Sequence, residues 1–398
     1  MIKHTAIHWS FFWSAGLAVL FVWNAVVSQT DYLKARFDSE ADKIYPAYFK
    51  VGGLIAFLAY KWISLRLSFR RRIFWMPCGL ALMSIAIFYI GEYLPMSSAK
   101  FPTLLGICFV DGFLSSILQT ALFSYAFKFG HLEITYVNTG NALIAVVVTS
   151  LSFLIDVVVD KSDLSIKALI YLVFQITTLT VLMIIFGRYC AAFQNEVKIV
   201  ERERKTENTR RERVSTGRLS KEVEKELGKE PPSLYQTFKI IYPFFFSMIL
   251  VYTITLGVFP GFLIDLGLNW DSPAATQVIL LAFNVFDCIG KWMFAWKQLG
   301  DNWIAPTISL SRMIFPIFVI SVFGSNEVTA LKDIPAFTIG FTSMMALTNG
   351  YITTALFSLA SSRCTDRHKD NAGFLMTFAM NFGLAYGAMC VAFGTSPS

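Results

Sequence analysis

The chain has 398 residues, of which 55% are hydrophobic, 16% are aromatic and only 15% are charged. This composition, with a mean hydropathy of +0.55, is far more apolar than one soluble core requires, and it predicts a polytopic membrane protein. The net charge of +7 is therefore read loop by loop, because basic loops orient membrane proteins. We expect the lipid bilayer as a partner and do not expect nucleic acid.

Apolar segments that are long enough to cross a bilayer, which takes about 20 residues, recur along the chain. In chain order they lie at residues 9–27, 46–65, 73–94, 101–127, 136–159, 168–186, 238–259, 276–296, 303–323, 335–360 and 371–393. The first is interpreted as a retained helix, because its apolar run is long for a signal peptide and no clear small-residue cleavage site follows. The expected fold class is all-α, with about eleven transmembrane helices.

A strongly charged stretch divides the chain. Residues 188–239 contain 13 Lys and Arg against 9 Glu, which gives a net charge of +4. We therefore predict a six-helix half at residues 1–187, a charged cytoplasmic linker at 188–237 and a five-helix half at 238–398.

Two further basic clusters, at residues 66–72 and 363–369, predict the orientation of the chain. When both clusters and the linker are placed inside, the N-terminus is cytoplasmic. An odd number of spans then puts Ser398 outside. The expected location is the plasma membrane.

Asp287 and Lys291 lie inside the eighth apolar segment, four residues apart. Residues with this spacing share one face of a helix, so the two side chains can meet. A charge near the bilayer centre costs roughly 2.5–3.5 kcal/mol, so we expect the pair to face inward, towards a polar cavity. The alternative is an ion pair that only fixes helix packing.

Other polar residues recur near the middle of the predicted helices in both halves. Asn24, Gln119 and Asn349 are of this kind, and Asp111 lies two helical turns before Gln119 on the same face. Six plus five helices with polar groups converging at mid-depth are typical of an alternating-access carrier. For any single amide, the alternative is an interhelical hydrogen bond worth about 0.6 kcal/mol.

No catalytic constellation is visible in the sequence. The four His lie in tails or loops, no phosphate-binding glycine loop occurs, and the six Cys have no metal-ligand spacing. We therefore expect no enzyme activity, no cofactor and no metal. A carrier of another small polar solute, a channel and a receptor remain alternatives, although no selectivity-filter motif favours a channel.

Short motifs in several segments resemble the equilibrative nucleoside transporter family, and protozoan members most. FDCIGK at 286–291 resembles the family's FDxxGR, RMIFP at 312–316 its RxxFxP, and TNGY at 348–351 its (S/T)NGY. The remaining similarities are Trp23-Asn24, Gln119 and the glycine-rich stretch 373–387.

The resemblance implies a shortened major-facilitator fold of six plus five helices. The implied substrate is a nucleoside or nucleobase, in particular a purine, moved down its gradient or together with protons. By the same resemblance Trp23 lines the site against the base, Gln119 binds base edges, and Asp287 with residue 291 binds the ribose hydroxyls.

Asn24 and Asn349 complete the expected substrate site, while Asp111 and Arg312 are candidates for structural or gating roles. The sequence departs from the family at Lys291, where the family usually has Arg. A guanidinium offers a two-pronged donor and an ammonium is a compact point charge, so ribose recognition is the feature that this change puts in question. Asp111 has no counterpart in the family's pattern.

Overall fold

The computed structural model describes residues 6–38, 41–95, 99–159, 163–193, 232–259, 275–296, 303–324 and 334–394. Within these ranges the chain forms helices and no strand. The helices of the first half are α1 (Ala6–Val27), α2 (Thr30–Arg36), α3 (Ala41–Arg66), α4 (Phe69–Tyr93), α5 (Lys100–Phe129), α6 (His131–Val158) and α7 (Leu164–Ala192). Those of the second half are α10 (Leu234–Val258), α12 (Ala275–Trp296), α13 (Ile304–Ser311), α14 (Ile314–Gly324), α16 (Pro335–Arg363) and α17 (Asp366–Gly394).

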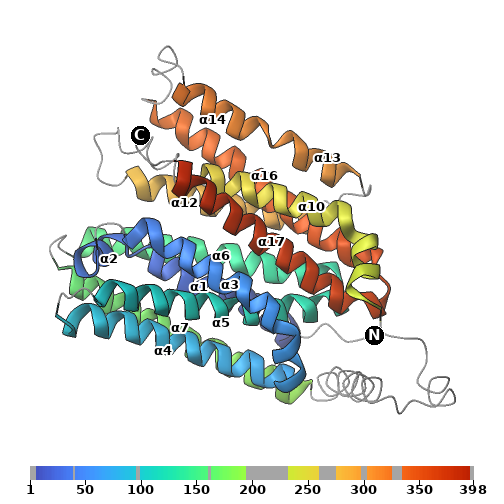
Figure 1. Ribbon diagram of the computed structural model, residues 1–398, viewed down its shortest axis with the longest axis horizontal. Coiled ribbons are helices and arrows are strands. Elements are labelled where there is room, and N and C mark those ends of the chain that lie inside the picture. Colours follow the sequence, from blue (N-terminus) through green and yellow to red (C-terminus); the bar gives the residue numbers. More distant parts are fainter. Residues whose placement is uncertain are drawn as a thin grey trace.

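The all-helical membrane fold is confirmed. Figure 1 shows the blue-to-green helices α1 to α7 grouped beside the yellow-to-red helices α10 to α17, with the long axes of most helices roughly aligned. Nine candidate membrane spans occur among the described residues. The other two predicted spans correspond to α3 and α16, which are 26 and 29 residues long but more polar, so the count of eleven remains a prediction. Most of the predicted linker lies outside the described residues.

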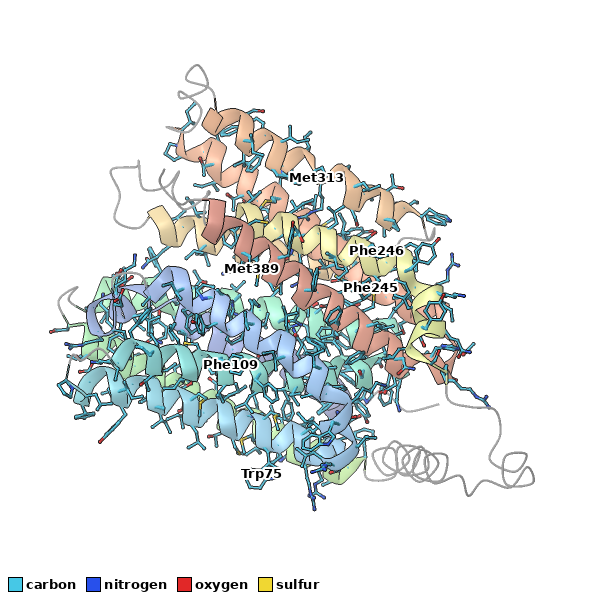
Figure 2. The ribbon with its side chains drawn as sticks, in the orientation of Figure 1. Trp75, Phe109, Phe245, Phe246, Met313 and Met389 are labelled. Carbon is cyan, nitrogen blue, oxygen red and sulfur yellow. The ribbon has the colours of Figure 1, made fainter. Side chains whose placement is uncertain are left out.

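The outer surface of the bundle is apolar. Trp75 points away from the helices in Figure 2 and is 59% exposed, and Leu58 on α3 is 82% exposed. Large apolar side chains with this exposure are costly in water and favourable against lipid tails. The hydrophobic effect therefore places this surface in the bilayer.

The ninth predicted span is broken where a single helix was expected. Helix α13 ends at Ser311 and α14 begins at Ile314, so Arg312 lies at the break. Pro316 has no backbone N–H to bond the Arg312 carbonyl four residues earlier, and its ring would collide with that carbonyl in a regular helix. The Phe315 amide bonds that carbonyl instead, at 3.0 Å.

The same close helix contact occurs once in each half. An added methyl group at Gly52 of α3 or Gly112 of α5 would overlap backbone of the opposite helix, and the same holds for Gly290 of α12 and Gly350 of α16. Only glycine permits this approach. Each pair is separated by 60 residues, and adding 238 to the first pair gives the second. The two halves are therefore structural repeats in register at these helices.

Aromatic pairs follow the same repeat. Tyr45 of α3 stacks on Trp23, with ring centroids 5.6 Å apart, and the residue 238 positions later, Phe283 of α12, stacks on Phe259 at 3.8 Å. The side chains next to these glycine contacts can therefore be compared position by position between the halves.

Side chains from α3 and α17 close one end of the seam between the halves. Lys61 Nζ donates to Asn371 Oδ1 at 2.9 Å, and the Tyr60 ring stacks on Phe374 with centroids 5.6 Å apart. Phe57 packs edge-on against the same Phe374 ring. We call these five residues the clamp; they lie where α3 ends and α17 begins.

Candidate substrate site

Asp287 and Lys291 form a buried ion pair on α12. Lys291 Nζ lies 2.7 Å from Asp287 Oδ2. The Lys291 side chain is 7% exposed and the Asp287 side chain 9% exposed. The spacing of four residues places them on one face of the helix. A pair buried this deeply offsets its lost hydration only when further hydrogen bonds satisfy its remaining atoms.

Asn349 provides such a bond from the neighbouring helix α16. Its Nδ2 donates to Asp287 Oδ1 at 2.7 Å, and Gly350, the next residue, allows the α16 backbone to reach the Asp287 carbonyl. Asn349 Oδ1 in turn accepts from Thr255 Oγ1 of α10 at 2.8 Å. Thr255 Oγ1 accepts from Arg312 Nη2 at 2.9 Å. A continuous chain of hydrogen bonds thus runs from the ion pair to Arg312.

Arg312 is 1% exposed and is held by α16 as well. Its Nη1 donates to Thr348 Oγ1 at 3.1 Å and to the Met345 carbonyl at 3.3 Å. The helix break at Arg312 places the side chain against α10 and α16. The network therefore contains two basic side chains and one acid, which favours ligands that present hydrogen-bond acceptors.

The ion pair lies close to the seam between the halves. Asn284 is seven residues before Lys291, two turns away on the same face of α12. Asn284 Nδ2 donates to Thr149 Oγ1 of α6 at 2.8 Å. Since α6 belongs to the first half, this face of α12 is directed at the first half.

Gln119 of α5 also lies at the seam, but it already has a protein partner. Its Oε1 accepts from Asn381 Nδ2 of α17 at 2.7 Å, and both side chains are buried. A ligand that binds Gln119 has to replace this bond. The geometry is consistent with both readings of the sequence, a ligand-binding amide and an interhelical hydrogen bond.

Trp23 is half-buried among residues of α3. Its ring stacks on Tyr45 and packs against Phe49 at a centroid distance of 4.6 Å, while Lys50 Nζ lies 4.6 Å from its centroid. The neighbouring Asn24 donates from Nδ2 to the Leu20 carbonyl of its own helix at 2.8 Å. The structure therefore groups Asp287, Lys291, Asn349 and Arg312 in one network and places Trp23 in a separate aromatic group.

Asp111 is fully buried on α5, and neither carboxylate oxygen has a hydrogen-bond partner in the described part of the chain. One turn later, Ser115 Oγ donates to the Val19 carbonyl of α1 at 2.7 Å. Asp111 therefore lies on the side of α5 that faces α1 and α3. The Tyr45 hydroxyl of α3 is within electrostatic reach of Asp111.

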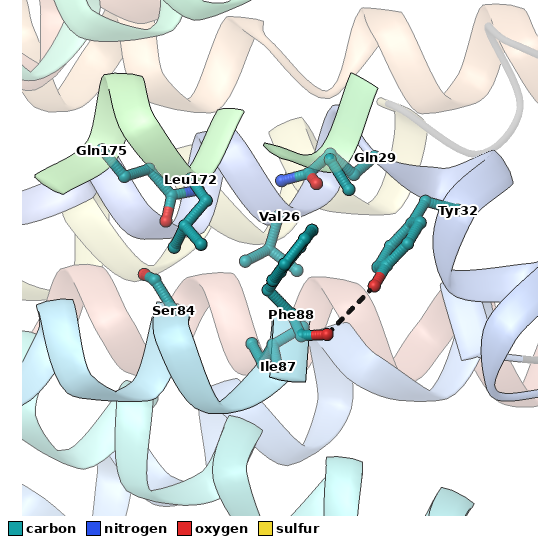
Figure 3. A pocket seen from close by; sticks show the side chains of 9 residues that line it. Val26, Gln29, Tyr32, Ser84, Ile87, Phe88, Leu172 and Gln175 are labelled. Atoms are coloured by element: carbon teal, nitrogen blue, oxygen red, sulfur yellow. Dashed lines mark hydrogen bonds between the residues drawn. The ribbon is translucent and has the colours of Figure 1, made fainter. Parts of the chain in front are cut away.

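In the described part of the chain, no three His, Cys, Asp or Glu side chains lie close enough together to hold a metal ion. A small cavity of about 20 Å³, which has room for about one water molecule, lies elsewhere, among α1, α2, α4 and α7 (Figure 3). Its lining includes Gln29, Tyr32 and Gln175, and the Tyr32 hydroxyl donates to the Phe88 carbonyl at 3.4 Å. This cavity is within the first half and does not include the ion pair.

Three residues of these groups, Asn381, Lys50 and Thr255, were not predicted from the sequence. Asn381 carried a usable signal, since it is an amide in a helix of small and apolar residues. Lys50 was also detectable as a base in a predicted span. Thr255 was not, because a Thr in a membrane helix commonly bonds its own backbone and has no special spacing here.

The family model described as Nucleoside transporter matches residues 104–393. The chain is 26% identical to equilibrative nucleotide transporter 1 of Arabidopsis thaliana over 403 residues, which cover 95% of this chain and 84% of that protein. It is also 26% identical to equilibrative nucleoside transporter 1 of Homo sapiens over 171 residues, covering 40% of this chain and 37% of that protein.

Solved structures of major facilitator proteins share the fold. The proton:xylose symporter XylE superimposes with a TM-score of 0.68 at 10% identity, covering 96% of this chain and 87% of that chain. A bacterial homologue of the iron transporter ferroportin, in an outward-facing state, gives a TM-score of 0.57 at 10% identity, with 96% of each chain covered. At this identity the likeness concerns the fold alone.

Proposed function

Because this chain belongs to the nucleoside transporter family, we propose that it carries purine nucleosides and nucleobases across the plasma membrane by alternating access. The observation that carries the proposal is the buried hydrogen-bonded network from Lys291 to Arg312, which joins α10, α12 and α16 and lies on the face of α12 that is directed at the first half. Polar groups buried at this depth are functional by default, because each costs free energy to keep.

The ligand would bind by exchanging hydrogen bonds. In the structure the polar groups satisfy one another: Asp287 binds Lys291 and Asn349, and Gln119 binds Asn381. A nucleoside offers ribose hydroxyls to the first group and the amide-like edge of a base to Gln119. The exchange costs little, because each broken protein bond is replaced by a ligand bond.

Trp23 would contribute the apolar side of the site. An indole ring presents a flat surface on which a base can stack. Lys50 Nζ and the Tyr45 ring, both from α3, contact the indole and hold its plane in place. Asn24, next to Trp23, would bind the ligand through its side-chain amide once the hydrogen bond from Asn24 Nδ2 to the Leu20 carbonyl is released.

Lys291 bears on the choice between nucleoside and free base. An ammonium donates along three directions and does not offer the paired, coplanar donors of a guanidinium. Here one of those directions is occupied by Asp287. We propose that the ribose is held by fewer bonds than an Arg would provide, and that nucleobases are accepted alongside nucleosides.

The clamp supports an assignment of the conformation. It lies at the end of α3 that leads into the 66–72 basic cluster, which the charge pattern places in the cytoplasm. We therefore propose that the site is closed towards the cytoplasm and that substrate enters from the opposite end, near Trp23. In this orientation the N-terminus is cytoplasmic and the C-terminus is outside.

Uptake in a host that lacks purine transport tests the proposal. Labelled adenosine, hypoxanthine and uridine are supplied to cells that display the chain, to cells with Asp287→Asn at equal surface abundance, and to cells with empty vector. We expect saturable adenosine and hypoxanthine uptake only with the unmodified chain. Uptake of uridine alone would remove the purine assignment, and uptake of none of the three would remove the proposed substrate class.

A further inference from the structure

We propose that Asp111 binds a transported proton, so that the chain couples nucleoside movement to proton movement. This inference rests on the proposed function and adds the coupling ion to it. It follows from the repeat between the halves, from the burial of Asp111 and from the route that leads to it.

The repeat identifies the residue that corresponds to Asp111. Gly52 and Gly112 of the first half correspond to Gly290 and Gly350 of the second half, 238 positions later. At the same offset, Asp111 corresponds to Asn349. In the second half Asn349 is satisfied by Asp287. The residue in the first half that corresponds to Asp287 is Phe49, which has no polar atom on its side chain.

Asp111 therefore occupies a position built for a hydrogen-bonded amide, opposite a phenyl ring. It is 0% exposed, and both its oxygens are without a partner in the described part of the chain. A buried carboxylate without a partner is strongly unfavourable, whereas the neutral acid resembles the amide that fills the repeat position. The site stabilises Asp111 when it carries a proton.

The groups around Asp111 leave the negative charge uncompensated. From α3 the titratable groups are Tyr45 and Lys50, and from α5 itself Cys108. Lys50 Nζ is directed over the Trp23 ring. α1 contains no Asp, Glu, Lys or Arg and has His8 in its first turn, and the charged residues of α4 lie in its first and last turns. Among its Asp, Glu, Lys and Arg residues, α6, which also packs against α5, has only acids, Glu133 in its first turn and Asp156 near its end. The middle of α17, on the other side of α5, has none either.

The proposed proton route reaches Asp111 from the predicted outer side, past Trp23 and Tyr45. Ser115 bonds the Val19 carbonyl, and because α1 and α5 run in opposite directions, one turn outward along each helix lie Asp111 and Trp23. Trp23 is half-buried, and beneath it the Tyr45 hydroxyl has no hydrogen-bond partner among the described residues. This hydroxyl can accept one proton and donate another, so rotation of its O–H bond, with an intervening water, can pass a proton from the outer side to Asp111.

The coupling step conserves the proton. A proton from the outer solution binds an Asp111 Oδ atom while the site faces outward. The neutral acid crosses with the loaded carrier, and the same proton leaves to the inner solution when the seam opens on that side. The empty carrier returns with Asp111 unprotonated, which completes the cycle, and because burying that charge is costly we expect this return to be the slow step.

Proteoliposomes with an imposed pH difference test the proposal. The membrane potential is set to zero with potassium and valinomycin, the outside is one pH unit more acidic than the inside, and labelled adenosine is followed to its end point. A one-to-one symport predicts about tenfold accumulation. For Asp111→Asn we expect an end point of about onefold, because the amide mimics the protonated acid permanently. Asp111→Glu restores a titratable group and is expected to restore accumulation above onefold.

Cys108→Ala is the matched control, since Cys108 is buried one turn away on the same helix, and it is expected to keep the tenfold end point. An unmodified chain that equilibrates adenosine to onefold under the gradient overturns the proton proposal and leaves the proposed function intact. No adenosine entry at all removes the proposed function instead. Tenfold accumulation that survives in Asp111→Asn, or that requires sodium in place of the pH difference, overturns the role of Asp111.

Discussion

Removing both members of the Asp287–Lys291 pair separates substrate binding from helix packing. Deleting one partner of a buried ion pair leaves an uncompensated charge and typically costs about 3–5 kcal/mol of stability, whereas deleting both can be nearly neutral. We therefore expect Asp287→Ala and Lys291→Ala each to lower the amount of protein at the surface. We expect the double variant to recover most of that protein.

The structure predicts different costs for the two single variants. Asp287 accepts from Lys291 and from Asn349, each at 2.7 Å, so Asp287→Ala leaves both donors unpaired and should fall at the upper end of the range. Lys291→Ala leaves Asp287 with its Asn349 bond and should cost less. In the double variant only the Asn349 amide remains unpaired, which costs about 1–3 kcal/mol.

Surface abundance, melting temperature and initial adenosine uptake are measured for all three variants in one host. If the pair contacts substrate, uptake per surface molecule stays near background in the double variant, because no charged group is left to meet the ligand. Near-normal uptake per surface molecule in the double variant would refute the reasoning and leave the pair a packing device.

An exposed pair on another helix provides the control. Lys369 Nζ lies 2.9 Å from Asp366 Oδ1, and the Asp366 side chain is 93% exposed. Exposed ion pairs contribute about 0–1 kcal/mol, so Asp366→Ala should change neither abundance nor uptake measurably.

The remaining predictions concern helix contact, selectivity and orientation. Gly350→Ala places a methyl group into the facing α12 backbone and should destabilise the protein by about 1–3 kcal/mol, whereas Gly340→Ala on the same helix meets open space and should be neutral in a melting measurement. Gln119→Leu should change the ranking of competing purines more than it lowers surface expression; an equal loss for every substrate would assign the residue to packing. Lys291→Arg should retain transport and raise the ratio of adenosine to hypoxanthine uptake, and complete loss in a well-folded variant would contradict this. A protease site inserted in residues 194–231 should stay uncut when protease is added outside intact cells, and cleavage would reverse the predicted topology.

The fold was predictable where the membrane restricts the backbone conformations that a segment can adopt. Long apolar segments have to be helices in a bilayer, because helices satisfy their own backbone polar groups. The break at Arg312 was not predicted, although Pro316 supplied the signal. A proline in a membrane helix does not by itself say whether the helix bends or breaks, because neighbouring helices decide how the freed carbonyl is satisfied.

The site was predictable to the extent that it lies on one helix. The spacing of Asp287 and Lys291 was sufficient to predict their contact, and the structure has it at 2.7 Å. The bond from Asn349 to Asp287 depends on how α16 packs against α12, which no local pattern encodes. Gln119 is a similar case: its residue type was informative, but its partner Asn381 is 262 positions away. Whether these residues bind substrate remains a prediction.

The shared register of the two halves has a consequence for protein engineering. A duplicated unit that keeps its backbone spacing supplies two side-chain solutions for one geometry, a phenyl ring beside an acid at Phe49 and Asp111, and an acid beside an amide at Asp287 and Asn349. Side chains that occur at a position in one half can therefore guide substitutions at the equivalent position of the other half. The paired change Phe49→Asp with Asp111→Asn would copy the Asp287–Asn349 hydrogen bond to α3 and α5, although Gly53, at the position of Lys291, supplies no cation for the new acid. Variants of this chain can be designed by copying between its own repeats.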